Sequence, residues 1–162
     1  MPSADTIRIH RAEASDAEGV LECLRAAFAP YKSFYSTEAF EDSVLTHESF
    51  PKRLEQMTVF VAVNDSGTVV GTIACCVSSN AEGHLRGMGV RPEWQASGIA
   101  NRLLRCAEEE LSKQNCRRIT LDTTEPLQRA IRFYERRGYR RSGRVQDFFG
   151  MPLIEYVKEV GR

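Results

Sequence analysis

The segment from Val90 to Ala100 most constrains the fold, because it joins a β-like run to a long amphipathic helix through a short loop of small residues. The helix follows from the apolar spacing of Ile99, Leu103, Leu104, Ala107 and Leu111. Backbone N–H groups at the start of a helix are unpaired and lie at the positive end of its dipole. This arrangement predicts a phosphate-binding cradle in an α/β fold. An ordinary strand-to-helix connection with Gly98 as a turn residue is the alternative.

The remaining elements follow from alternation and helical spacing. The predicted strands are 7–11, 58–63, 68–77, 84–90, 118–123, 139–146 and 151–160, with a turn at 80–83, and the predicted helices are 15–30, 99–114 and 126–137. Ser15 and Glu18 match a capping box at the first helix. Residues 31–55 predict one or two short helices. The order predicts a single α/β domain over residues 1–162, with a mixed, mostly antiparallel sheet of about seven strands and helices on both faces.

Composition excludes several classes of protein. The 162 residues include 22 basic and 22 acidic side chains, so the formal net charge is zero, and we expect no nucleic-acid partner. The five cysteines include no CxxC pair, so we expect neither a disulfide framework nor a metal site. The sequence lacks an apolar segment of about 20 residues and a signal-peptide pattern. We therefore expect a cytoplasmic protein with no membrane partner.

The zero net charge hides an uneven distribution. Residues 1–70 carry 6 basic and 11 acidic side chains, whereas residues 117–162 carry 11 basic and 6 acidic ones. A cationic and an anionic ligand could therefore meet different surfaces of one domain.

Two motifs resemble the GCN5-related N-acetyltransferase superfamily. Gln95, Gly98 and Ala100 match its pyrophosphate loop, whose pattern is Gln or Arg, two residues, Gly, any residue, then Gly or Ala. Ala96 stands where the family often has glycine. Residues 130–139 are similar to the second motif, a helix that carries Phe-Tyr and ends in Gly and an aromatic residue. The order of elements also agrees, so the resemblance covers essentially the whole chain.

The resemblance implies transfer of an acetyl group from acetyl-CoA, as co-substrate, directly to an amine in a ternary complex. The acceptor is a small molecule, an amino acid derivative or a protein amine. Backbone N–H groups would hold the pyrophosphate at Gln95, Ala96, Ser97, Gly98, Ile99 and Ala100. The pantetheine would pair with the strand edge at Met88, Gly89 and Val90, where a bulge would separate this strand from the next. The N–H of Met88 or Gly89 would stabilise the oxyanion.

One position departs from the family pattern. Leu127 stands where the family often has an asparagine that contacts the coenzyme, and Thr123 or Thr124 is expected to substitute for it.

Two residues are candidates for proton transfer. Tyr134 would donate a proton to the departing thiolate, and we expect Phe133 to face the core and Tyr134 the cleft; the alternative is a boundary aromatic with its hydroxyl in water. His84 stands where many family members use a carboxylate base, and its pKa near neutrality suits that role. The alternatives are a surface histidine, with Glu82 or a water relay as the base.

The acceptor would meet an aromatic and acidic wall. Tyr31, Phe34, Tyr35 and Glu38 could bracket a cationic amine, or the aromatics could pack a short helix onto the sheet. Two rival functions stay open: a non-catalytic acyl-CoA-binding sensor with the same fold, and a nucleotide-binding regulator. A homodimer through edge strands is possible.

Overall fold

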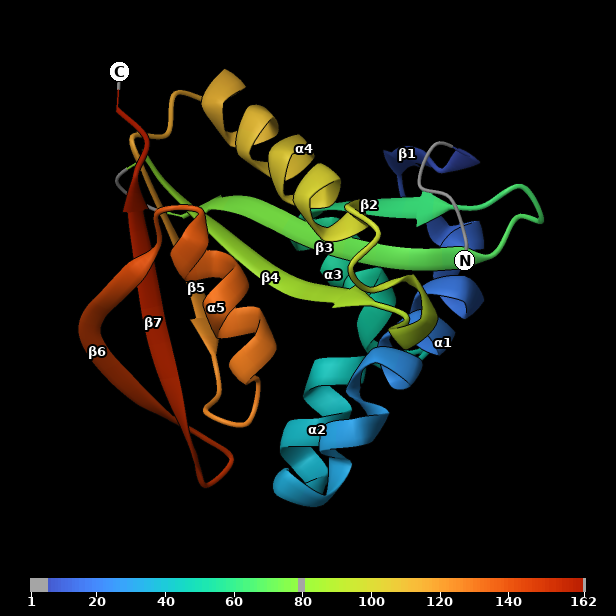
Figure 1. Cartoon of the computed structure of the whole chain (residues 1–162), viewed down its shortest axis with the longest axis horizontal. Coiled ribbons are helices and arrows are strands. Elements are labelled where there is room, and N and C mark those ends of the chain that lie inside the picture. The colour runs from blue at the N-terminus through green and yellow to red at the C-terminus, as the bar shows by residue number, and fades with distance from the viewer. Residues whose placement is uncertain (1–5, 79–80, 162) are drawn as a thin grey trace.

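The structure is a computed structural model in which residues 6–78 and 81–161 are described. The described residues form one seven-stranded sheet of order β1-β2-β3-β4-β5-β7-β6 (Figure 1). The strands are β1 (Arg8–Arg11), β2 (Thr58–Val63), β3 (Val69–Ser78), β4 (Glu82–Val90), β5 (Arg118–Thr123), β6 (Arg140–Phe148) and β7 (Met151–Glu159). Neighbouring strands are antiparallel except β4 and β5, which are parallel. The predicted mixed, mostly antiparallel sheet is confirmed.

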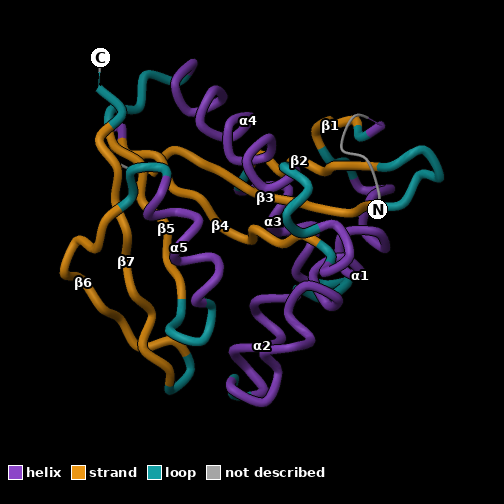
Figure 2. Tube along the Cα trace, viewed as in Figure 1, coloured by secondary structure: helices purple, strands orange, loops and turns teal. Residues whose placement is uncertain are grey.

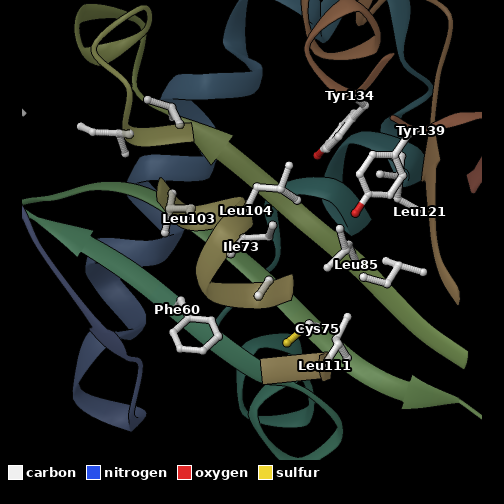
Figure 3. Packing of buried hydrophobic residues seen from close by; sticks show 14 of the residues in the cluster. Phe60, Ile73, Cys75, Leu85, Leu103, Leu104, Leu111, Leu121, Tyr134 and Tyr139 are labelled. Carbon is white, nitrogen blue, oxygen red and sulfur yellow. The ribbon is translucent and has the colours of Figure 1, made fainter. Parts of the chain in front are cut away.

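Helices cover both faces of this sheet (Figure 2). The helices are α1 (Ala17–Phe28), α2 (Thr37–Val44), α3 (Ser49–Gln56), α4 (Ile99–Lys113) and α5 (Gln128–Arg136). Alternation along β2 explains the two layers. Phe60 packs with the α4 and α5 cluster (Figure 3), whereas the next residue, Val61, packs with α1, α2 and α3. Among the described residues, no helix has the length and apolar composition needed to cross a bilayer.

Three predicted boundaries differ from the structure. The capping box at the first helix is formed by Glu13 and Asp16 on a 3-10 turn, and α1 begins at Ala17, so the Ser15–Glu18 box is wrong. Helix α5 begins two residues after Pro126. The predicted turn at 80–83 partly falls on Asn80, which lies outside the described residues, and Glu82 and Gly83 already belong to β4.

Strand β4 separates from β5 halfway along its length. The two strands pair only from Glu82 to Leu85, although β4 continues to Val90. On its other side, the register with β3 shifts by one residue around Gly87 and Met88, and Gly87 has a φ of 66°. The predicted bulge is therefore confirmed, and it opens the sheet between β4 and β5.

Candidate active site

Two neighbouring cavities lie where β4 leaves β5. The larger, of about 540 Å³, lies between the loop before α4 and helix α5, and the smaller, of about 310 Å³, reaches α2, α3 and β5. Both cavities are lined by Phe28, Met88, Leu127, Ala130 and Tyr134. Two ligands, one in each cavity, would therefore meet at this shared wall.

The start of α4 presents unpaired backbone donors to the larger cavity. The helix begins after Gly98, whose φ of 90° favours glycine, and its first backbone hydrogen bond joins the Arg102 N–H to the Gly98 carbonyl at 3.1 Å. The N–H groups of Ile99, Ala100 and Asn101 precede that bond and have no partner within the helix. The first turn carries no acidic side chain. This end of α4 suits an anion.

The loop residues contribute to the larger cavity in different ways. Gln95, Ala96, Gly98 and Ala100 line it, as do Met88, Gly89 and Val90 of β4. The Gln95 amide nitrogen donates to the Val90 carbonyl at 3.1 Å, which ties the loop to the strand end. The Ser97 hydroxyl donates to the Trp94 carbonyl and the Ile99 side chain lies in the core, so both residues offer only their backbone.

Ala96 adopts a strained conformation in this loop. Its φ of 65° lies in the left-handed region, where a Cβ costs about 1 kcal/mol. Ala96→Gly should therefore raise the free energy of unfolding by about 0.5–1 kcal/mol. Ala100→Gly, inside the first turn of α4, should lower it by about as much. Urea unfolding checks both values, and equal losses in the two variants would show that Ala96 is unstrained.

Helix α5 supplies positive charge to the larger cavity. Arg129, Arg132, Arg136 and Arg137 line it. The Arg137 guanidinium stacks on the Phe133 ring at 3.8 Å, and its Nε donates to the Asn101 side chain at 2.7 Å. Part of the basic C-terminal region thus faces the same cavity as the start of α4.

Tyr134 is the buried aromatic of α5. It is 6% exposed, belongs to the core cluster and lines both cavities, whereas Phe133 is half-buried beneath Arg137. The expectation that Phe133 is the core-facing partner is wrong. The Tyr134 side chain reaches toward β4 with its hydroxyl foremost (Figure 3), and within the described chain that hydroxyl has no hydrogen-bond partner. Burial raises the pKa of this phenol, so it stays protonated.

His84 lines the smaller cavity beside a carboxylate. Its Nδ1 lies 2.9 Å from the Thr120 hydroxyl, which donates to the Gly83 carbonyl at 3.4 Å. The Nδ1–H is then the donor to Thr120, and Nε2 faces Asp122 with its nearest carboxylate oxygen 3.7 Å away. Burial lowers the pKa of His84 and raises that of Asp122, so both shifts favour the neutral forms.

The residues of the predicted acceptor wall separate in the structure. Tyr35 lines the smaller cavity and its hydroxyl lies 2.6 Å from the Thr124 hydroxyl, whereas Tyr31 lines the larger one. Phe34, 63% exposed, and Glu38 line neither cavity. Thr123 lines the smaller cavity and not the larger. Its predicted contact with the coenzyme would therefore involve the part of the coenzyme that reaches the shared wall.

Four charged residues of the smaller cavity were missed from the sequence: Asp42, Arg53, Arg86 and Asp122. Arg86 donates to the Asp42 carboxylate at 2.7 Å. Asp122 and Thr120 are two residues apart on β5, so their side chains lie on the same face of the sheet. Their proximity to His84 depends on the register between β4 and β5.

Comparison with known proteins identifies acetyltransferases, both by a family model and by similar structures. A family model described as the acetyltransferase (GNAT) family matches residues 20–139. The structure resembles a GNAT-family acetyltransferase from Staphylococcus aureus, with a TM-score of 0.78 and 21% identity over 95% of this chain and 99% of that one. It also resembles PaiA N-acetyltransferase from Thermoplasma acidophilum in complex with coenzyme A, with a TM-score of 0.77 and 22% identity over 94% and 98%.

A third similar structure is the ribosomal-protein-S18-alanine N-acetyltransferase from Escherichia coli, with a TM-score of 0.76 and 18% identity over 96% of this chain and 95% of that one. These structural likenesses establish the fold.

Proposed function

The chain belongs to the GNAT family of acetyltransferases, and we propose that it moves the acetyl group of acetyl-CoA directly to a primary amine in a ternary complex. The observation that carries the proposal is the shared wall of the two cavities at Met88 and Tyr134. A donor in the larger cavity and an acceptor in the smaller one would have their reacting atoms side by side at that wall. The reaction between two bound molecules would then be effectively unimolecular, which lowers its entropic cost.

The residues of the larger cavity fit acetyl-CoA. The unpaired N–H groups at the start of α4 and the arginines of α5 suit its phosphates. From Arg86 to Val90, β4 has no strand partner on the β5 side within the described chain, so its backbone groups can pair with the amides of pantetheine. The N–H of Met88, at the bulge, would stabilise the negative charge that develops on the thioester oxygen.

Two side chains would move the protons. His84 Nε2 takes a proton from the acceptor ammonium, which frees the nitrogen lone pair to attack the thioester carbon, and the Asp122 carboxylate stabilises the imidazolium formed. The C–S bond then breaks, and the Tyr134 hydroxyl protonates the departing sulfur. Burial keeps this phenol protonated until the thiolate forms, and the phenolate then regains a proton from the acetylated nitrogen, which must lose its second one to become the amide.

The proposal is tested by following free-thiol release from acetyl-CoA over a panel of primary amines. Amine-dependent release supports transfer. Tight acetyl-CoA binding with no release for any amine would instead support a non-catalytic acyl-CoA sensor. Calorimetry separates the remaining rival, because tight ATP binding with no response to acetyl-CoA would contradict the transferase and support a nucleotide-binding regulator.

The pH dependence follows from the pKa of His84, which burial lowers below its ordinary value of 6.5. The charged groups that act on it are Asp122, Arg86, Glu155 and Glu82. Below the shifted pKa, Nε2 is protonated and cannot act as base, so kcat/KM should fall as pH falls and level off above about pH 6.5.

Rates measured over about pH 5 to 8 check this profile, with His84→Gln as the comparison. The variant should be slower at neutral pH and should lose the acidic step. A wild-type profile whose acidic step survives in His84→Gln would assign the base to another group.

A further inference from the structure

The smaller cavity contains a buried arginine without a counter-ion. Arg53, on α3, is 8% exposed and lines the cavity. Its guanidinium makes no hydrogen bond or ion pair with any residue in the described ranges 6–78 and 81–161. Lysine and arginine side chains are almost never this buried unless they are paired. The position therefore requires an explanation.

The guanidinium lies at the bulge of β4. A Cβ at Gly87 would come within 2.5 Å of Arg53 Nη1, so the absence of a side chain at Gly87 makes room for this group. Gly87 has a φ of 66° and lies where β4 departs from β5. Arg53 thus reaches the opening of the sheet, beside the shared wall of the two cavities.

The neighbouring charges do not neutralise Arg53. Asp42 is the nearby carboxylate, but Arg86 already holds it through a hydrogen bond of 2.7 Å. The three side chains together carry one net positive charge. Burial, together with the like charge of Arg86, lowers the pKa of Arg53 to about 10, so the guanidinium is still charged at neutral pH. Asp122, the other carboxylate of the cavity, lies against His84, so Arg53 has no direct counter-ion and a bound anion could pair with it.

We propose that the acceptor is an amine that also carries a carboxylate, and that Arg53 binds this carboxylate through the planar donor pair of its guanidinium. The inference rests on the proposed function, because it names the acceptor of that reaction. The carboxylate would lie at α3 and the bulge, with the amine directed to His84 and Asp122, which line the same cavity. In place of the expected aromatic and acidic wall for a cationic amine, the cavity then has a site for a zwitterion.

Matched acceptors test this inference. The probes are the α-amino acids with their primary amides, together with β-alanine and γ-aminobutyrate, each assayed for N-acetylation at saturating acetyl-CoA. We expect kcat/KM for the best acid to exceed that for its amide by about 10- to 100-fold, the range of a charge-assisted bidentate pair. Calorimetry of the same acids and amides gives a readout that does not depend on turnover.

Variants of α3 assign the preference to one side chain. Arg53→Met should reduce the preference for acid over amide at least tenfold and, because it removes a buried unpaired charge, should raise the melting temperature. Arg53→Lys should keep part of the preference. The matched control is Lys52→Met, which removes a positive charge from the exposed side of the same helix and should leave the preference unchanged.

The outcomes separate the two proposals. Amides that are bound and acetylated as well as acids, or a preference that survives in Arg53→Met, would overturn the carboxylate assignment and leave the acetyltransferase intact. Acids bound more tightly than amides through Arg53, but with no acetylation of any amine, would support the anion site and contradict the proposed function.

Discussion

Tyr134→Phe is expected to lower kcat by about 100- to 10,000-fold while leaving the affinity for acetyl-CoA nearly unchanged. Tyr134 lines both cavities, and the substitution removes only its hydroxyl, which faces β4 and has no hydrogen-bond partner in the described part of the chain. The ring, and with it the packing against Tyr139, is retained. Stopped-time thiol release and calorimetry with acetyl-CoA measure the two quantities.

The neighbouring ring provides a matched control. Tyr139 is equally buried, but its hydroxyl donates to Glu108 at 2.7 Å and it lines neither cavity. Tyr139→Phe should therefore cost about 0.5–1.5 kcal/mol of stability, the value of one hydrogen bond, because Glu108 keeps Lys158 as a donor at 3.1 Å, and it should cause no comparable loss of kcat. Similar rates for wild type and Tyr134→Phe would exclude Tyr134 as the acid.

Ala100→Glu is expected to weaken acetyl-CoA binding by about 100- to 1,000-fold. Ala100 lies in the first turn of α4 and lines the larger cavity, so a carboxylate there would face the pyrophosphate. Two unit charges 4 Å apart repel by about 4 kcal/mol at an effective dielectric constant of 20. The same substitution should raise the free energy of unfolding by about 0.3–1 kcal/mol, because an acidic residue at a helix N-terminus interacts favourably with the helix dipole.

The neutral variant Ala100→Gln separates charge from size. It should bind acetyl-CoA much more tightly than Ala100→Glu, and the difference should narrow as salt increases. Equal loss in both variants would mean that the side chain blocks the cavity sterically, which would contradict an anion site formed by the start of α4.

Local patterns were sufficient to predict most of the fold. The alternation of β2 places Phe60 and Val61 on opposite faces, and the glycine at 87 marks the bulge, because these signals depend on residues adjacent in the chain. The capping box was misassigned because Ser15 and Glu18 match the residue types of the pattern, whereas Glu13 and Asp16, which form the box, share only its spacing.

The site was predicted less completely, for a physical reason. The loop before α4 is local, so its position followed from the sequence. Phe133 was wrongly assigned to the core face of α5, although Ile131 and Tyr134, three residues apart, share the helix face that is buried. The burial of Arg53 could not be predicted, because it depends on a cavity formed by β4 and β5, which are distant from Arg53 in sequence. Charged cavity residues from short helices carry no local signature.

In the proposed reaction the acetyl group passes from the donor in one cavity to an amine in the other. The most direct measurement incubates the protein with deuterated acetyl-CoA and the amine panel and analyses the amines by mass spectrometry. We expect a deuterated acetyl group on the nitrogen of at least one amine, with free CoA released in equal amount. Deuterated acetate as the sole product, with every amine unlabelled, would contradict the proposed reaction.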